Sequence, residues 1–360
     1  MERQRILVIG AGVLGSLLAA RLQDGGHDVS VLARGQRLRD LREHGIALED
    51  DEGRGRTTTH VNVVERLAPE DAYDLALVVV QHQQTGAVLP ALAANRHIPS
   101  VLFLQNNPCG PEALTSALGG ARVLWGFPAM GGTRDGHVVR YTLAGRDKPK
   151  VVLGEPDGSI TARTRSVAAA LESAGIAVEL RQDMDAWLKH HAALVSPVAL
   201  AIYAAAGDNY RLARTRDGIV LAIRAVREGV DALVRLGYPL SPPGLKVLFW
   251  LPEPVLVAVL KQVFASKLGE TGMTRHANAA REEMGQLVDA VLSFGRKANM
   301  PMPYMTRLYA YLNPDMPPMP EGSRHIALDW REVKVLVVVV IVALVALGML
   351  LARRKGLRRR

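Results

Sequence analysis

The chain contains a single cysteine, Cys109, among its 360 residues. One cysteine cannot form a disulfide within the chain or build a cysteine-based zinc site, so we predict no metal centre and a reducing compartment. Aromatic residues make up only 5% of the sequence, and no basic stripe is interleaved with them. A nucleic-acid partner is therefore not expected.

The positive charge is concentrated at the C-terminus. The formal net charge is 44 − 35 = +9, and six basic residues within residues 353–360 supply +6 of it, leaving 9 − 6 = +3 for the rest of the chain. Residues 1–5 are too short and too charged for a signal peptide, so we expect none. The length suggests two domains, and a hydrophobic content of 49% is ample for their cores.

A glycine-rich motif follows the first apolar run of the chain, Ile6 to Ile9, and precedes a helical pattern from Ser16 to Leu22. A strand, a GxGxxG turn and a helix in this order are typical of a dinucleotide-binding site. The first glycine allows the tight turn, the second lets the backbone approach a pyrophosphate, and the third lets the helix pack closely on the strand. The predicted cofactor-binding residues of the motif are Gly10, Ala11, Gly12, Val13, Leu14 and Gly15.

The end of the second strand, Val29 to Leu32, indicates which dinucleotide binds. NAD-binding proteins place an acidic residue there to hold the ribose 2′-hydroxyl, whereas an arginine suits the 2′-phosphate of NADPH. Arg34 occupies this position, Arg37 follows closely, and the first acidic residue is Asp40. A guanidinium group matches phosphate oxygens well, so we predict NADPH as the cofactor and Arg34 as its 2′-phosphate ligand.

Two further apolar runs, Asp74 to Val80 and Ser100 to Leu104, are typical of strands covered on both faces. Strands that alternate with helices predict an α/β fold with a doubly wound parallel sheet. Ligands of such sheets bind beyond the carboxyl ends of the strands. Gln81, Gln105 and Asn106 are therefore predicted on the rim of the cofactor and substrate site.

The second half of the chain changes from short strands to long helical segments near Arg181 to Asp183. We expect a Rossmann-type NADPH-binding domain over residues 1–181 and an all-helical substrate domain over residues 182–320. Residues 321–334 are predicted to form a linker.

Four stretches and the last expected helix resemble the ketopantoate reductases (2-dehydropantoate 2-reductases), within the wider 6-phosphogluconate-dehydrogenase-like superfamily. The resemblance covers residues 1 to about 312. The stretches are the glycine-rich unit with Leu32-Ala33-Arg34-Gly35, Val101 to Asn106, Gly131 to Val139, and Trp187-Leu188-Lys189, and the helix begins at Arg281-Glu282-Glu283-Met284. The resemblance implies NADPH-dependent reduction of a 2-keto acid, 2-dehydropantoate to pantoate, a step of pantothenate biosynthesis.

The resemblance also implies three catalytic residues. Lys189 would donate the proton, Glu283 would help hold the substrate, and Asn106 would lie near the nicotinamide. A carbonyl that accepts hydride develops negative charge on oxygen, which a nearby ammonium group stabilises and protonates. Glu282 is the alternative to Glu283 if the alignment slips by one residue.

The sequence departs from the family in the substrate pocket. The family helix carries asparagines four and eight residues after its lysine, where this chain has Ala193 and Pro197. Ser196, His190 or His191 are candidates to replace them, although packed or solvated histidines are more common. The family lysine after the fourth strand is Gln81 here, the glycine after Asn106 is Asn107, and the family serine before the last helix corresponds to Thr271. The hydride-transfer machinery is thus better preserved than the substrate pocket.

Residues 335–352 form an 18-residue run without a charge, near the length that spans a bilayer. We predict a transmembrane helix there, followed by a basic tail over residues 353–360. The catalytic part is expected in the cytoplasm, which would place the basic tail outside, against the positive-inside rule. An alternative is that the segment lies on the inner leaflet with its arginines on anionic lipid.

Three functions remain open from the sequence. The leading one is a membrane-attached, ketopantoate-reductase-like enzyme acting on a small 2-keto acid. The second is a reductase of a larger or more apolar carbonyl compound, and the third is a non-catalytic NADPH-binding protein at the membrane. The sequence leaves a homodimer open.

Overall fold

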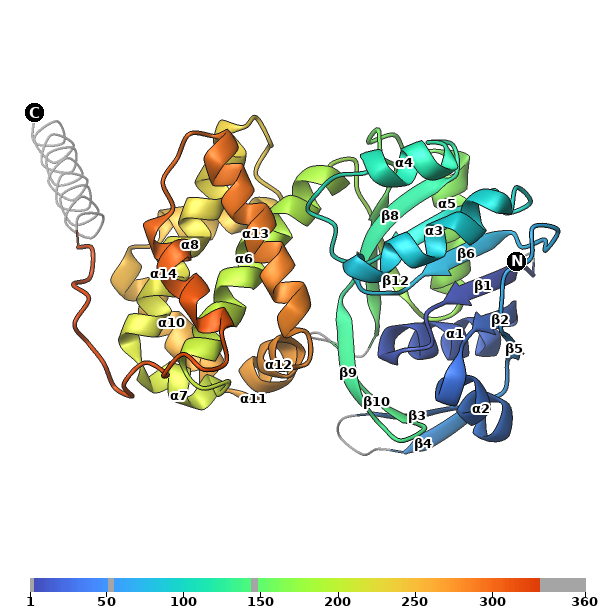
Figure 1. Cartoon of the computed structure of the whole chain (residues 1–360), viewed down its shortest axis with the longest axis horizontal. Helices are drawn as coiled ribbons and strands as arrows, with labels where there is room; N and C mark the ends of the chain where they lie inside the picture. The colour runs from blue at the N-terminus through green and yellow to red at the C-terminus, as the bar shows by residue number, and fades with distance from the viewer. Residues whose placement is uncertain (1–2, 51–54, 144–147, 331–360) are drawn as a thin grey trace, which may run out of the picture.

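The computed structural model describes residues 3–50, 55–143 and 148–330 of the chain. An α/β domain carries the N-terminus, and a helical domain packs beside it (Figure 1). The predicted transmembrane helix, the basic tail and the end of the predicted linker lie outside the described residues. An α/β Rossmann-type unit followed by a helical region confirms the predicted fold class for the rest of the chain.

The α/β domain is built on an eight-stranded sheet. The switch point between β1 and β6, where the chain turns back to build the other half of the sheet, is the place where such folds bind ligands. In spatial order the strands are β12 (Ala177–Leu180), β11 (Lys150–Gly154), β8 (Val123–Pro128), β7 (Val101–Leu104), β6 (Leu75–Val78), β1 (Arg5–Ile9), β2 (Asp28–Leu32) and β5 (Asn62–Val64).

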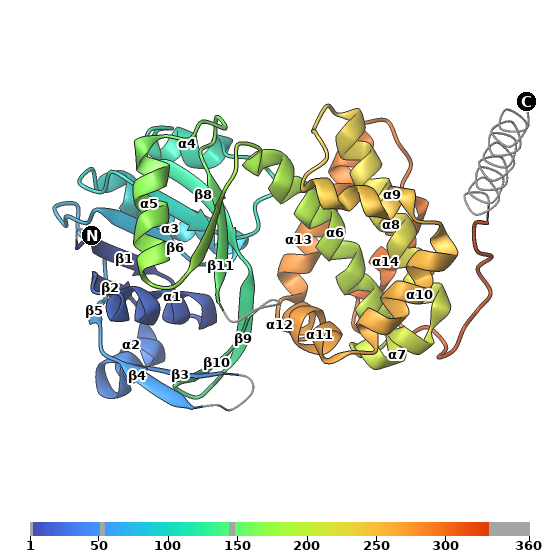
Figure 2. The ribbon, with the colours of Figure 1, turned by 180° about the vertical axis from the view of Figure 1, so that it is seen from behind.

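Helices cover both faces of this sheet, which explains the continuous apolar runs of β6 and β7. One face packs against α1 and α5, and the other against α3 and α4 (Figures 1 and 2). The helices of the domain are α1 (Val13–Asp24), α2 (Gly35–His44), α3 (Thr85–Ala94), α4 (Glu112–Leu118) and α5 (Ala162–Ser173), with the short turn η1 (His82–Gln84).

The structure corrects the prediction of a purely parallel sheet. β11 pairs antiparallel with β8, so the far edge of the sheet is mixed. A second sheet, which the sequence analysis did not predict, has the order β4 (Arg56–Thr59), β3 (Ile46–Asp50), β10 (Val138–Leu143) and β9 (Met130–Asp135). This sheet packs on the start of α1, where a Cβ added to Gly132 would lie 2.9 Å from Val13 Cγ1.

The helical domain is organised around two long helices, α6 and α8, and its core includes residues of both. A loop of three small residues ends α6, because Gly207 (φ 75°) donates its N–H back to the Ile202 carbonyl at 2.8 Å. The helices are α6 (Met184–Ala204), α7 (Asn209–Arg214), α8 (Arg216–Arg235), α9 (Val247–Trp250), α10 (Glu253–Phe264), α11 (Lys267–Gly269), α12 (Arg275–Ala279), α13 (Arg281–Lys297) and α14 (Pro303–Tyr309). Short turns are η2 (Pro243–Lys246), η3 (Glu270–Thr274) and η4 (Ala310–Leu312).

Two helical details differ from expectation or bear on the membrane. The helix of Glu283, expected as the last, is α13, and α14 follows it after Met302. Among the described residues, no single helix has the length and hydropathy of a membrane span. Residues 243–250 and 253–264 together meet these criteria by length and composition alone, and they are bent by 119°.

Candidate functional site

The glycine-rich turn between β1 and α1 is tightly packed at Gly10 and Gly15 but has open space at Gly12. Gly10 has φ +109°, and a Cβ there would lie 2.3 Å from the Val79 carbonyl oxygen. A Cβ on Gly15 would lie 1.8 Å from the Gly10 carbonyl oxygen, whereas one on Gly12 would meet no heavy atom within 4 Å. Gly12 is also the N-cap of α1 and supplies no side-chain cap. The start of α1 thus has no side-chain cap and has space at its N-cap residue, an arrangement suited to phosphate.

Arg37 fixes this turn in place. Its guanidinium group is buried and donates to the Ala11 carbonyl at 3.0 Å, to the Ser16 hydroxyl at 2.9 Å and to the His137 carbonyl at 3.1 Å. Burial, and then the nearby Arg134 cation, lower the pKa of Arg37 from its usual value. Because its donors hold the turn to the second sheet, Arg37 has a structural role that its spacing from Arg34 did not indicate.

Arg34 has the opposite environment. It is exposed at the N-cap of α2, directly after β2. The sequence prediction of a cation at the end of the second strand agrees with this location. An exposed guanidinium can form paired hydrogen bonds with an anionic group.

Polar side chains gather where β6 and β7 end. Gln81 lies between the end of β6 and η1, and its side-chain oxygen accepts from Gln83 Nε2 at 2.9 Å. Gln105 is buried, and its Oε1 accepts from the Thr85 hydroxyl at 2.9 Å, while its Nε2 has no partner. Asn106 is also buried and is the next residue along.

The two domains meet in a buried hydrogen bond between Asn106 and Glu283. Asn106 Nδ2 donates to Glu283 Oε1 at 2.9 Å, and both residues are about 95% buried, with exposures of 6% and 5%. Glu282, the alternative candidate, is exposed. The structure therefore brings two of the three predicted catalytic residues together, from sequence positions 177 residues apart.

Within the described residues, several buried polar atoms that follow β6 and β7 in sequence lack a hydrogen-bond partner. They are His82 Nδ1, Gln83 Oε1, Gln105 Nε2 and Asn107 Oδ1. Burial lowers the pKa of His82, and the nearby Glu283 carboxylate acts in the opposite direction, so His82 lies within electrostatic range of the Asn106–Glu283 pair. Unpaired buried polar groups are costly, and a polar ligand at this edge would satisfy them. Sequence reasoning missed His82 and Gln83, although both directly follow the β6 run.

Lys189, the third catalytic candidate, is buried on α6 with an exposure of 4%. Its ammonium group forms an ion pair with Asp185, one helical turn earlier, and lies 4.8 Å from the ring centroid of Tyr238. Asp185 was also missed by sequence reasoning, although its four-residue spacing from Lys189 is the usual spacing of helical ion pairs. No hydrogen bond links Lys189 to Asn106 or Glu283 in the described residues.

The helix face that carries asparagines in the family is closed here. Ala193 is fully buried against α8, where a Cβ added to Gly229 would lie 3.0 Å from Ala193 Cβ. The Ser196 hydroxyl donates to the Ala192 carbonyl at 2.7 Å, and the half-buried Thr271 donates to the Lys267 carbonyl at 2.9 Å. Both hydroxyl groups thus donate within their own helical segments, which leaves them poor substitutes for the missing amides.

The two histidines after Lys189 have different surroundings. His191 stacks on Trp187, with ring centroids 5.1 Å apart, and contacts Phe127 of β8 at 4.2 Å. Burial lowers the pKa of His191 to about 4, with a smaller effect from His276. His190 Nδ1 lies 2.7 Å from the Ala186 carbonyl. His191 packs α6 against the α/β domain, as expected for the more common structural role of such histidines.

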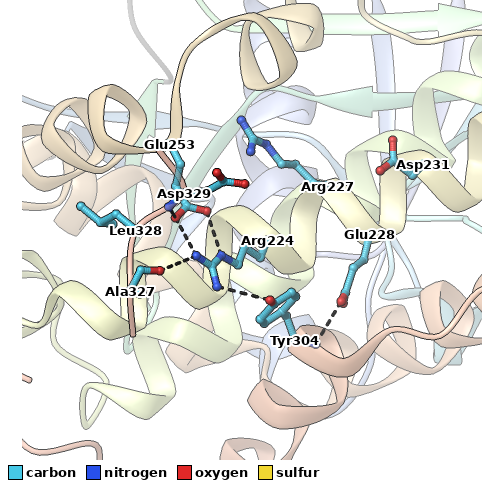
Figure 3. Close-up of a pocket in the computed structure, with 9 residues that line it drawn as sticks. All are labelled: Arg224, Arg227, Glu228, Asp231, Glu253, Tyr304, Ala327, Leu328 and Asp329. Carbon is cyan, nitrogen blue, oxygen red and sulfur yellow. Dashed lines mark hydrogen bonds and ion pairs between the residues drawn. The ribbon is translucent and has the colours of Figure 1, made fainter. Parts of the chain in front are cut away.

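A cavity of about 470 Å³ lies elsewhere, within the helical domain (Figure 3). None of its lining residues belongs to the α/β domain or to the Asn106–Glu283 pair. It is lined by Arg224, Arg227, Glu228, Asp231, Glu253, Tyr304 and residues 327–329. Among the described residues, no three His, Cys, Asp or Glu side chains are grouped to hold a metal ion.

Known proteins are similar to this chain in sequence and in fold. Residues 6–158 match the family model described as "Ketopantoate reductase PanE/ApbA". A 2-dehydropantoate 2-reductase of Archaeoglobus fulgidus is 31% identical over 250 residues, which cover 66% of this chain and 76% of the relative.

Two solved structures illustrate the shared fold. A 2-dehydropantoate 2-reductase of Geobacter metallireducens superposes with a TM-score of 0.69 at 19% identity, over 86% of this chain and 98% of its own. A D-mandelate dehydrogenase, solved with NADH and anilino(oxo)acetate, superposes with a TM-score of 0.71 at 16% identity, over 86% and 96%. At these identities the two superpositions establish the fold alone.

Proposed function

Because this chain belongs to the ketopantoate reductase family, and is thus an oxidoreductase of a keto or hydroxy group, we propose that it reduces a 2-keto acid with NADPH. The observation that carries the proposal is the buried bond between Asn106 and Glu283. It joins the end of β7, on the cofactor rim, to the first turn of α13 in the helical domain. A substrate bound there lies between the two domains.

The residues of the α/β domain fit a pyridine nucleotide. The space at Gly12 and the uncapped start of α1 suit the pyrophosphate, and the partnerless Gln105 and Asn107 atoms suit polar groups of the nicotinamide or substrate. Gly10, Ala11, Val13, Leu14 and Gly15 would form the turn under the phosphates. Arg34 favours NADPH over NADH because its guanidinium group would bind the 2′-phosphate.

The proposed chemistry divides between the cofactor and three side chains. A bound NADPH supplies the hydride that reduces the carbonyl carbon of the substrate. Asn106 orients groups at the rim, and Glu283 holds the substrate through hydrogen bonds. Lys189 stabilises the negative charge that develops on the carbonyl oxygen and donates the proton, while Asp185 holds the ammonium group in position.

The preferred substrate is a second question. Ketopantoate is the family substrate, but the closed face at Ala193 and Pro197 lacks the amides that would bind it. Each hydrogen bond to a charged group contributes about 1.5–3 kcal/mol, so the loss of two weakens binding of a small polar acid. A larger or more apolar 2-keto acid is the second candidate, and the shared fold with a D-mandelate dehydrogenase favours it.

The predicted C-terminal helix would attach this enzyme to a membrane, with its catalytic part in the cytoplasm. The support is the uncharged run over residues 335–352 and the basic residues that follow it. A non-catalytic NADPH-binding role would also accommodate the cofactor fit. The ion-paired Lys189 beside Asp185 favours the enzyme, because a purely binding protein has no need of a buried ammonium group there.

The test is NADPH oxidation by the full-length chain in detergent, with ketopantoate and phenylglyoxylate as substrates and NADH as the cofactor control. We expect Lys189→Ala to lower kcat by about 10²–10⁴-fold while the NADPH Kd stays within about threefold. The matched control is Lys261→Ala, because Lys261 is an exposed helix lysine on α10. Tight NADPH binding without turnover of any 2-keto acid would reject the enzymatic proposal and leave the binding protein.

A further inference from the structure

Two exposed tryptophans lie close to one hydrogen bond at the end of the described chain. Trp250 ends α9 and is 77% exposed, and Trp330 is 52% exposed. The Asp329 N–H donates to Glu253 Oε1 at 2.9 Å, and Glu253 is the first residue of α10. The last described residue therefore lies beside the bend between α9 and α10.

Residues 323–330, which we call the C-terminal strap, are held against the helical domain by charged side chains. Asp217 of α8 accepts from the N–H groups of His325 at 2.8 Å and Ile326 at 3.0 Å. Arg224 donates to the Ala327 carbonyl at 2.7 Å (Figure 3). The strap is thus fixed on α8 over several residues before the chain leaves the domain.

Glu253 connects the strap to the body of the domain. Its carboxylate is 1% exposed and accepts from Arg224 Nε and Nη2, each at 2.8 Å, in addition to the Asp329 N–H. A buried bidentate pair of this kind has a defined geometry. The point where the chain leaves the domain is therefore fixed relative to α9 and α10.

The same two helices present several exposed apolar side chains. Val255 and Val259, one turn apart on α10, are 42% and 49% exposed, and Val247 of α9 is 47% exposed. The opposite face of α10 packs in the core through Leu256 and Phe264. α10 thus packs on the domain with Val255 and Val259 facing outward. We call Val247, Trp250, Val255 and Val259 the α9–α10 face.

Basic residues border this face. Lys246, Lys261 and Lys267 are exposed beside it. A helix that lies in a membrane interface combines apolar and tryptophan side chains with flanking lysines, which attract anionic lipids. Only four residues separate Trp330 from the uncharged run over residues 335–352.

We propose that the α9–α10 face and Trp330 rest on the surface of an anionic phospholipid bilayer. The strap holds the helical domain in one orientation on the membrane. The inference goes beyond the proposed reduction of a keto acid, and it rests on the proposed membrane attachment. The bilayer would then explain both the fixed position of the strap and the exposed apolar side chains.

The test uses tryptophan fluorescence of the full-length chain in vesicles of phosphatidylcholine and phosphatidylglycerol with brominated acyl chains. Trp125 is 1% exposed and Trp187 packs against Phe127, so neither reaches lipid. The quenched signal should come from Trp250 and Trp330 alone. We therefore expect Trp250→Phe to reduce the quenched fluorescence by about half, with NADPH turnover unchanged.

A charge placed in the face gives the matched comparison. Val259→Glu should lift the face from the bilayer and reduce quenching of Trp250 as measured in a Trp330→Phe background. Val234→Glu should not, because Val234 is equally exposed, at 51%, but lies on α8. Neither valine belongs to the proposed catalytic or cofactor-binding residues.

Three results would overturn the inference. If the vesicle-bound chain is quenched equally with and without Trp250, only the C-terminal segment contacts lipid. If the chain does not bind vesicles, the membrane attachment fails as well, whereas the proposed reductase activity is measured separately and stands. If the chain dimerises in detergent and Trp250 becomes shielded from an aqueous quencher, a second copy covers the face instead.

Discussion

The two sides of the candidate site differ in how their polar groups are satisfied. At the ends of β6 and β7, Gln105 Nε2 and Asn107 Oδ1 are buried without partners, and Asn106 reaches across to Glu283. On α6, the Lys189 ammonium is paired with Asp185 and the Ser196 hydroxyl donates to its own helix. The α/β side thus offers unpaired polar atoms to a ligand, whereas the Lys189 and Ser196 side chains of α6 are paired within their own helix.

This difference separates two properties that the family combines. Cofactor binding depends on backbone geometry at the glycine-rich turn and on strand ends, and both are retained. In the proposed site, substrate choice depends on a few side chains of α6. One of these positions, Ala193, is buried against α8 and presents no polar group. Under the proposed function, such a chain can keep the reaction type of its family with a different preferred substrate.

Among the changes that test this comparison, the largest expected effect comes from removing the charge of Glu283, which links the two sides. Glu283→Gln keeps the size of the side chain but replaces a carboxylate oxygen that accepts from Asn106. We expect kcat/KM to fall by about 10²–10³-fold, because a buried charged group that positions a substrate contributes about 3–4 kcal/mol. Steady-state kinetics with the preferred 2-keto acid measure it.

Glu282→Gln is the matched control for this prediction. Glu282 is adjacent in sequence but exposed, so its loss should change kcat/KM by less than about twofold. Equal effects of the two substitutions would show that the Asn106–Glu283 contact does not define the site.

Arg34 tests the α/β side of the comparison, and its substitution is expected to have a smaller effect than that of Glu283. Arg34→Ala should weaken NADPH binding by about 10–100-fold and leave NADH binding nearly unchanged, since only NADPH carries the 2′-phosphate. Arg39→Ala serves as the control because Arg39 is an exposed arginine on the same helix. Fluorescence titration with both cofactors measures the ratio, and parallel losses of both would remove Arg34 from the phosphate site.

The sequence predicted the α/β side well because its signals are local. The glycine spacing, the apolar runs and the polar residues after them each lie within a few residues of the feature that they position. Asn106 and Glu283 were assigned to one site only through the family resemblance, and their contact was not predicted, because no local pattern connects residues 177 apart. The second sheet was missed because β3 and β10 pair across about ninety intervening residues, and their short, mixed sequences carry little periodicity.

The α6 side was predicted less well for a related reason. The spacing of Lys189, Ala193 and Pro197 places them on one helix face, but it does not say what that face contacts. The packing of Ala193 against Gly229 depends on α8, which begins more than twenty residues later. Likewise, Asp185 was visible in the sequence, yet its pairing with Lys189 rather than with solvent depends on burial by the surrounding domain.

Restoring one family asparagine tests whether the packing around Ala193 on α6 leaves room for an amide side chain. Ala193→Asn would force a larger polar side chain against Gly229 and the core residue Val291. We expect a loss of about 2 kcal/mol in the free energy of unfolding and no gain in ketopantoate turnover, because the face has no room for an amide. Urea unfolding measures the first quantity. Ala258→Asn, on an exposed position of α10, should cost only about 0.5 kcal/mol, the difference in helix propensity.

A stable Ala193→Asn variant that gains ketopantoate activity would instead show that the face opens to substrate. In that case the difference between the two sides would reflect the lost side chains and not the packing behind them.

The smallest expected effect concerns the pH dependence of the contact between α6 and the α/β domain. Burial lowers the pKa of His191 from 6.5 to about 4 in the folded chain, so the unfolded chain binds a proton between these values and the folded chain does not. The resulting stability is fully present above pH 6.5 and is lost as the pH falls toward 4. At about pH 5.5 the loss from this residue is roughly 1.4 kcal/mol.

His191→Phe keeps an aromatic ring against Trp187 and Phe127 without a titratable group. The free energy of unfolding of this variant should therefore fall less than that of the unaltered chain between about pH 7.5 and 5.5. Urea unfolding at the two pH values measures the difference, and equal losses in both proteins would place the acid sensitivity outside this contact.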